Sequence, residues 1–127
     1  MRLSKVLLWG LVLVALPTTA TAQSVISVVT AKTKGDDAAY LDKLRAAKPL
    51  VMRLGASSYR VFRAAVAGEG SGAIVSVAEY KDWPTFAEAR AKRTTDEAFQ
   101  KWYRDLVGSG VSELVSIELL EEVTVAP

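Results

Sequence analysis

Residues 58–83 read SYRVFRAAVAGEGSGAIVSVAEYKDW, and this stretch decides the fold. Two runs rich in β-branched and aromatic residues, Ser58–Ala67 and Ala73–Tyr80, flank the glycine-rich segment Gly68–Gly72. A connection this short between two strands predicts a hairpin turn. A glycine-rich loop can also bind phosphate, but that use requires a helix directly after the loop, whereas a strand-like run follows here. The stretch therefore predicts a β-hairpin.

A strand and a helix are predicted before the hairpin. Ser24–Lys32 (SVISVVTAK) is short and rich in β-branched residues, which favours a strand. Ala38–Leu54 carries apolar residues at steps of three and four, the spacing of one buried helix face. Asp36 or Asp37 can cap the start of this helix, and Gly55 can end it in the left-handed conformation.

Proline is expected to have opposite effects in the two helical regions. Pro49 lies inside the first one, so we expect a kink or a break between Ala46 and Leu50. Pro84 follows the capping residue Asp82 and falls in the first turn of the next helix, where its missing N–H costs nothing.

The second helical region can divide in two. Thr94–Glu97 (TTDE) fits a capping box in the middle of the region, which allows two consecutive helices. Gly108 and Gly110 end the region, and Ser112–Val123 (SELVSIELLEEV) reads as the last strand. The element order β-α-β-β-α-β, with right-handed crossovers, predicts an α+β ferredoxin-like fold: a four-stranded antiparallel sheet with the helices on one face.

The sheet face away from the helices has too few polar residues to be left in water. Pairing around the glycine-rich turn would place Arg63 opposite Val77 and Val61 opposite Glu79, and neither face of the hairpin is then fully polar. An apolar second face must be covered, and a second copy of the domain is the simplest cover. We therefore predict a homodimer, sheet against sheet.

Four polar side chains are predicted to line the space between the two sheets: Arg63, Glu79, Ser116 and Glu118. Arg63 could hold an anionic or carbonyl group, and Glu79 is the single, weak candidate for a general base. A purely structural ion pair between these two residues is the alternative. Trp83 and Trp102 are candidates for an aromatic ligand lining, with ordinary core or dimer packing as the alternative.

The first 22 residues resemble a secretory signal peptide. Arg2 and Lys5 form a positive start, an apolar run follows from Val6 to Leu16, and Ala20–Ala22 supplies an A-x-A site. Cleavage would leave a single domain over residues 23–127, exported to the periplasm or secreted, without a membrane anchor.

Composition excludes several kinds of site. The sequence has no His and no Cys, which excludes Ser-His-Asp and Cys-His nucleophiles, disulfides, and His- or thiolate-ligated metals. Of 16 basic residues two lie in the leader, so residues 23–127 carry 14 basic and 14 acidic side chains. This balance gives no electrostatic reason to expect nucleic-acid binding. We predict neither a cofactor nor a metal.

Over residues 25–123 the chain resembles the dimeric α/β-barrel superfamily, which includes antibiotic-biosynthesis-monooxygenase-like and NIPSNAP-like domains. The resemblance is carried by three segments: SYRVFRAAVAGEGSG (Ser58–Gly72), EYKDWPTFAEA (Glu79–Ala89) and DEAFQKWYRDL (Asp96–Leu106). It implies a barrel closed by two sheets that binds small, often aromatic molecules. Some members are cofactor-free oxygenases. Others handle haem through a His ligand, which this sequence lacks.

These observations together predict an exported homodimer that binds a small apolar or aromatic molecule between its sheets. Two alternatives stay open. The protein could be a cofactor-free, monooxygenase-like enzyme acting on a phenolic or polyketide-type substrate. It could also be a non-catalytic interaction module whose barrel is filled by its own side chains.

Overall fold

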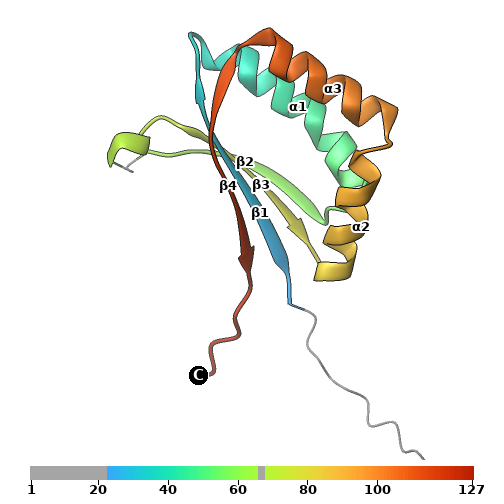
Figure 1. Ribbon diagram of the computed structural model, residues 1–127. Helices are drawn as coiled ribbons and strands as arrows, with labels where there is room; N and C mark the ends of the chain where they lie inside the picture. The colour runs from blue at the N-terminus through green and yellow to red at the C-terminus, as the bar shows by residue number, and fades with distance from the viewer. Residues whose placement is uncertain (1–22, 66–67) are drawn as a thin grey trace, which may run out of the picture.

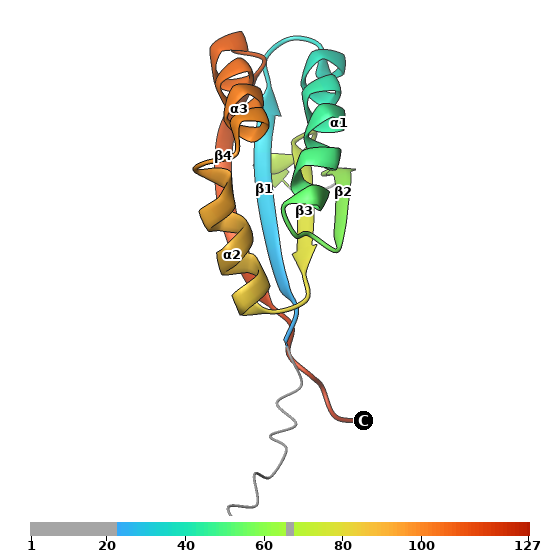
Figure 2. The same cartoon turned by 90° about the vertical axis from the view of Figure 1, so that its right-hand side faces the viewer.

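The fold has two layers, a four-stranded antiparallel sheet and a layer of helices on one of its faces (Figures 1 and 2). The computed structural model describes residues 23–65 and 68–127, so the predicted signal peptide lies outside the described residues. The elements are β1 (Val25–Thr33), α1 (Asp37–Arg53), β2 (Ser58–Arg63), the 3₁₀ turn η1 (Gly68–Gly70), β3 (Ile74–Tyr80), α2 (Trp83–Arg93), α3 (Glu97–Ser109) and β4 (Ser112–Glu121). The strand order is β2-β3-β1-β4, which confirms the predicted ferredoxin-like arrangement. No helix in this described part of the chain has both the length and the hydropathy to cross a membrane.

Aspartates begin all three helices. The Asp36 carboxylate accepts from the backbone N–H of the second residue after it at 3.0 Å, and Asp82 and Asp96 each accept from the third at 2.8 Å. Each bond satisfies one of the free N–H groups of the first turn. The division of the second helical region into α2 and α3 is therefore confirmed. Helix α3 continues through Gly108 and ends at Gly110, which takes a left-handed conformation (φ 65°).

The predicted break at Pro49 is wrong, because α1 runs without interruption from Asp37 to Arg53. Pro49 lies on the exposed side of the helix, between the buried residues Ala47 and Val51. Its ring removes one N–H donor on the side facing solvent, so the carbonyl that loses its partner is not trapped in the core. The buried face of α1 keeps the helix continuous.

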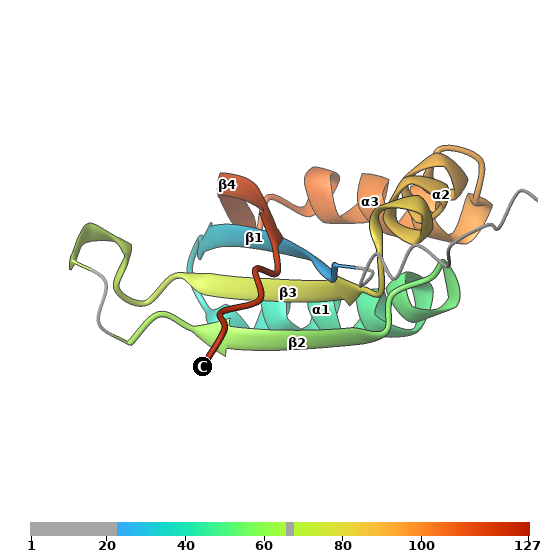
Figure 3. The same cartoon turned by 90° about the horizontal axis from the view of Figure 1, so that it is seen from below.

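The predicted register of the hairpin is also wrong. Arg63 pairs with Ile74 rather than Val77, and Val61 pairs with Ser76 rather than Glu79. The prediction assumed a tight turn at Gly68–Gly72, but strand pairing ends at Arg63 and the connection is longer. It includes η1 and projects beyond the ends of β1 and β4 (Figure 3). The observed register differs from the predicted one by three residues. Because side chains alternate between the two faces of a sheet, a shift by an odd number of residues turns every β2 side chain to the opposite face from the one predicted.

The helix side of the sheet contains the core. Tyr80, Ile74 and Val25 are its largest fully buried side chains, and all three lie on β1 or β3. Tyr80 meets Phe86 of α2 edge-on, with ring centroids 5.2 Å apart. This contact fixes α2 against the end of β3.

The other face of the sheet, which we call the open face, carries no helix (Figure 1). Its centre is apolar and is formed by paired residues of the two inner strands, such as Val28 and Val77. Phe62 of β2 and Leu120 of β4 flank this centre, and each is 47% exposed. The open face is thus an uncovered apolar surface in the single chain, as the sequence predicted.

Candidate functional site

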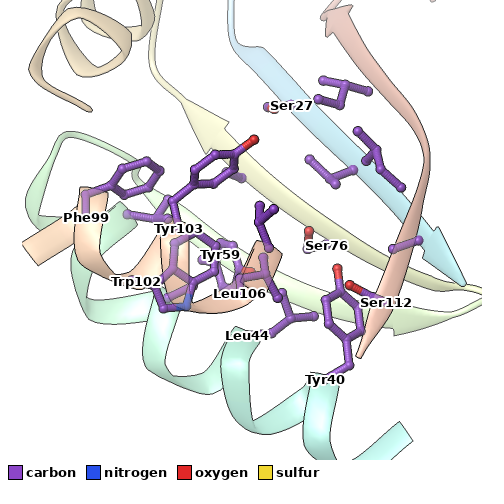
Figure 4. Close-up of a pocket in the computed structure, with 18 of the residues that line it drawn as sticks. Ser27, Tyr40, Leu44, Tyr59, Ser76, Phe99, Trp102, Tyr103, Leu106 and Ser112 are labelled. Carbon is purple, nitrogen blue, oxygen red and sulfur yellow. The ribbon is translucent and has the colours of Figure 1, made fainter. Parts of the chain in front are cut away.

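A cavity of about 400 Å³ lies between the helix side of the sheet and helices α1 and α3 (Figure 4). Its lining is mainly aromatic and aliphatic. The aromatic members are Tyr40, Tyr59, Phe99, Trp102 and Tyr103; the aliphatic members are Val29, Ala31, Leu44, Ala47, Val51, Ala78, Leu106, Val107, Leu114 and Ile117; the polar members are Ser27, Ser76, Ser112 and Arg93.

Small residues on the sheet create this space. Four small residues of the inner strands face the helices, and Ala47 of α1 faces the sheet. The four are Ser27 and Ala31 of β1 and Ser76 and Ala78 of β3. All five are buried. Because none of these side chains reaches far from its backbone, the large aromatic residues of α3 cannot close the gap. Sequence reasoning missed this cavity, because the four small residues of the two strands form one group only when the pairing of β1 with β3 is known.

The cavity opens between α3 and β4. Val107 of α3 and Leu114 and Ile117 of β4 line it and are 58–63% exposed. At its inner end, by contrast, Leu44 and Ala47 of α1 are at most 3% exposed. A ligand could therefore enter past an apolar rim and reach a buried, mostly apolar inner end.

Two hydroxyl groups meet at the floor of the cavity. The Tyr59 phenol shares a hydrogen bond with the side chain of Ser76, which is itself 6% exposed. Burial raises the pKa of Tyr59 to about 12, and burial also raises the pKa of Tyr40. Both phenols are therefore neutral at pH 7 and can donate or accept a hydrogen bond.

One cation borders the cavity, Arg93 at the end of α2. Its Nη2 donates to the Tyr80 hydroxyl, and its Cζ lies 5.3 Å from the centre of the Phe99 ring. The positive charge also acts on Tyr59, where it opposes part of the rise in pKa caused by burial. The cavity thus combines an apolar body with a few polar groups, the usual make-up of a small-molecule site.

The structure separates the four predicted polar residues. Glu79, Ser116 and Glu118 lie on the open face, paired with Ile26, Thr30 and Val28 of β1 respectively, where the sequence placed them. Arg63 does not join them, because the shifted register turns it to the helix side.

Arg63 has a different partner from the predicted one. It forms an ion pair with Asp37 in the first turn of α1, and Asp37 also accepts a hydrogen bond from Thr33 at 2.5 Å. The expected pairing of Arg63 with Glu79 is therefore wrong. Glu79 instead accepts a long hydrogen bond from the Ser58 hydroxyl, at 3.5 Å.

The two tryptophans have different surroundings. Trp102 lines the cavity, and its indole N–H donates to the carbonyl oxygen of Lys43 at 2.8 Å. Trp83 does not line it. It packs edge-on against Phe86 and donates to Glu121 at 3.2 Å, which joins the start of α2 to the end of β4. Of the two tryptophans, only Trp102 therefore lines this helix-side cavity.

Within residues 23–65 and 68–127, no group of three or more acidic side chains is gathered where it could hold a metal ion. The polar chemistry of the cavity is thus that of phenols, serine hydroxyls and one guanidinium.

No family model and no curated protein matches the chain. Solved structures do match it. SnoaB, a cofactor-independent oxygenase from Streptomyces nogalater, has a TM-score of 0.61 at 19% identity, covering 84% of this chain and 99% of its own. A NIPSNAP family protein of unknown function from Agrobacterium tumefaciens has a TM-score of 0.62 at 14% identity, covering 85% and 95%. A dimeric ferredoxin-like protein from an uncultured marine organism has a TM-score of 0.58 at 18% identity, covering 82% and 99%.

These similarities concern the fold. The chain has the ferredoxin-like fold shared by monooxygenase-like and NIPSNAP proteins, as its sequence resemblance implied. At identities below one in five, they carry no information on substrate or residue roles.

Proposed function

We propose that this protein binds a small molecule with a flat apolar or aromatic body in the cavity between its helices and its sheet. The observation that carries the proposal is the cavity itself, about 400 Å³ in volume and lined mainly by aromatic and aliphatic side chains. Ligand sites span roughly 300–1,000 Å³ and combine an apolar lining with a few polar groups. The sequence placed the ligand between two sheets, so this proposal moves the ligand to the other side of the same sheet.

We also propose that the working form is a homodimer closed over the open face. The open face supports this, because its apolar residues are uncovered in the single chain. Phe62 of β2 and Leu120 of β4 are each 47% exposed, on either side of the paired residues Val28 and Val77. An exposed apolar sheet surface of this kind is a ready surface for packing. One similar structure is that of a dimeric ferredoxin-like protein.

Export completes the proposal. The signal-peptide pattern of residues 1–22 supports it, and the intact mass of the protein isolated from its own host tests it. Cleavage before Gln23 is the expected result, and a protein that retains residues 1–22 contradicts it.

A cofactor-free oxygenase is the second candidate, favoured by the fold shared with SnoaB and by the closed aromatic interior. The substrate would supply its own electrons. One oxygen atom of O₂ would enter a ring carbon of an electron-rich phenol, and the other would leave as water with the two hydrogens lost from the substrate. Oxygen consumption with a panel of dihydroxyaromatic compounds tests this candidate, and an absence of turnover removes it.

The binding proposal is tested at the cavity mouth. Val107 lines the mouth and is 63% exposed, so Val107→Trp should block entry without disturbing the core. Val123, which is 74% exposed and does not line the cavity, provides the matched control Val123→Trp. With 2-naphthamide as the neutral probe in calorimetric titration, we expect Val107→Trp to weaken binding at least tenfold and the control to leave it unchanged. Wild-type protein that binds neither 2-naphthamide nor its carboxylate analogue 2-naphthoate, or equal binding by all three proteins, contradicts the proposal.

A further inference from the structure

Arg93 is a cation whose charge is not neutralised in the described part of the chain. The five ion pairs described there involve Arg45, Arg53, Arg63, Lys92 and Lys101, but not Arg93. Its Nε atom is buried and has no hydrogen-bond partner. Every other buried side-chain nitrogen or oxygen atom among the described residues finds a partner, so Arg93 is the exception.

Arg93 is half-buried, and the contacts that it does make leave its buried Nε atom without a partner. The Tyr80 hydroxyl is a neutral acceptor, and the Phe99 ring offers only the attraction of its π face. The C-terminal end of α2 adds a favourable partial negative charge. A guanidinium that loses part of its hydration is stabilised best by a carboxylate partner, because losing hydration without one is costly.

The position of this charge indicates what could neutralise it. Arg93 borders the cavity together with Tyr59, Ser76 and Phe99, so its side chain lies beside the space that a ligand would fill. A guanidinium presents planar, paired donors that match the two oxygens of a carboxylate, and it also binds a phenolate or enolate oxygen. A small turn of the side chain in the cavity would let Nε share in such a bond.

We propose that Arg93 makes the cavity selective for molecules that carry an oxyanion on a flat apolar body. The inference rests on the proposed function, because it assumes that the cavity binds a ligand, and it adds the chemical class of that ligand. The phenyl ring of Phe99 and the indole of Trp102 would hold the apolar body, and Arg93 would pair with the oxyanion. Because the hydroxyls of Tyr59 and Ser76 share a hydrogen bond, one of the two keeps its O–H free to donate to the same oxygen.

A matched pair of probes tests the inference. 2-Naphthoate and 2-naphthamide have nearly the same shape and differ in charge. We expect the purified protein to bind the carboxylate at least tenfold more tightly at pH 7, because hydrogen bonds to charged groups are the stronger ones. Arg93→Met should abolish this preference, and Arg93→Lys should keep only part of it. Arg90→Met removes the same charge from an exposed position on the same helix, and should keep the full preference.

The outcomes separate the two proposals. Equal binding of both probes by the wild type overturns the role of Arg93 and leaves the apolar cavity function standing. A preference that survives in Arg93→Met also overturns it. Binding of neither probe contradicts the cavity function and this inference together.

A second readout does not depend on the Met variant folding. The phenol of bound 4-nitrophenol should have a pKa lower than in water, followed by its visible absorbance, since a nearby guanidinium favours the phenolate. In Arg93→Lys the decrease should be smaller, and in Arg90→Met it should be unchanged. A bound nitrophenol whose pKa is raised in the wild type would overturn the inference, because burial would then dominate over charge.

Discussion

Leu44 and Ile74 allow the existence of the cavity to be tested by stability alone. Both are aliphatic residues of equal size in one buried cluster, and they are 3% and 1% exposed. Leu44 lines the cavity, whereas Ile74 does not. Truncation to Ala removes three carbon groups from either residue, a loss of about 2.4 kcal/mol at roughly 0.8 kcal/mol per buried group.

The two truncations should differ in the void that they leave. Ile74→Ala creates a new closed void in packed core, so its total cost should be about 3–5 kcal/mol, as for buried Leu and Ile elsewhere. Leu44→Ala only widens a space that already exists and opens to solvent, so its cost should stay near the transfer value, at about 2–3 kcal/mol. Urea unfolding at one fixed protein concentration measures both, because dimerisation would otherwise alter the comparison.

Ligand affinity provides the complementary measurement. Leu44→Ala should shift the preference toward a larger, three-ring homologue of 2-naphthamide, and Ile74→Ala should leave the preference as in the wild type. Equal destabilisation by the two substitutions, together with unchanged ligand preference, would mean that the space beside Leu44 is collapsed in solution. The reasoning that places a ligand there would then be refuted.

Three further predictions concern other parts of the molecule. Tyr59 ionises at about pH 12 in the fold against 10 in the unfolded chain, so the fold should lose about 2–3 kcal/mol of stability as pH rises from 10 to 12; Tyr59→Phe should remove this loss in alkaline unfolding titrations. The hydrogen bond from its arginine partner on α1 and the backbone hydrogen bond at its helix cap lower the pKa of Asp96. Its contribution to the stability of the fold is therefore complete above pH 3.8 and is lost as pH falls through the lowered pKa. Asp96→Asn should flatten the acid side of the plot of unfolding free energy against pH. Val77→Lys on the open face should yield a monomer by analytical ultracentrifugation, whereas Met52→Lys on α1, at a site 36% exposed, should keep the dimer.

Local signals explain why the fold could be predicted from the sequence. Asp36 and Asp82 each stand directly before a helix and accept the predicted backbone hydrogen bond. The capping box predicted a helix start at Thr94–Glu97, and α3 does start there, although Asp96 rather than Thr94 is the capping residue. Gly55 and Gly110 take positive φ angles at helix ends, where other residues would be strained. These are interactions between residues one to four positions apart, so they can be recognised without a structure.

The site could not be predicted in the same way, because it depends on distant residues and on register. The hairpin pairing is fixed by where strand β2 stops, at Arg63, and no residue type near that point marks it. The predicted register differs from the observed one by three residues. This error alone placed Arg63 on the open face of the predicted sheet, beside Glu79. The cavity depends on Ser27, Ser76 and Ala47, which are far apart in the sequence. These small residues leave one shared space only when β1, β3 and α1 are packed together.

Strand β4 connects the two proposed roles, since it serves both faces of the sheet. Ile117 lines the cavity mouth, while the adjacent residues Ser116 and Glu118 face the open side. A second copy packed on the open face would therefore hold the strand that forms one wall of the mouth. Ligand binding and dimerisation would then be linked, and each would strengthen the other by the same factor.

This linkage predicts that affinity for 2-naphthamide falls as the protein is diluted below its dimer dissociation constant. Val77→Lys should show the weaker affinity at every concentration, because it removes the second copy without touching the cavity lining. Fluorescence titrations across a hundredfold range of protein concentration measure the effect. One affinity shared by dilute wild type, concentrated wild type and the variant would show that each protomer forms its mouth alone, and that the two faces of the sheet act independently.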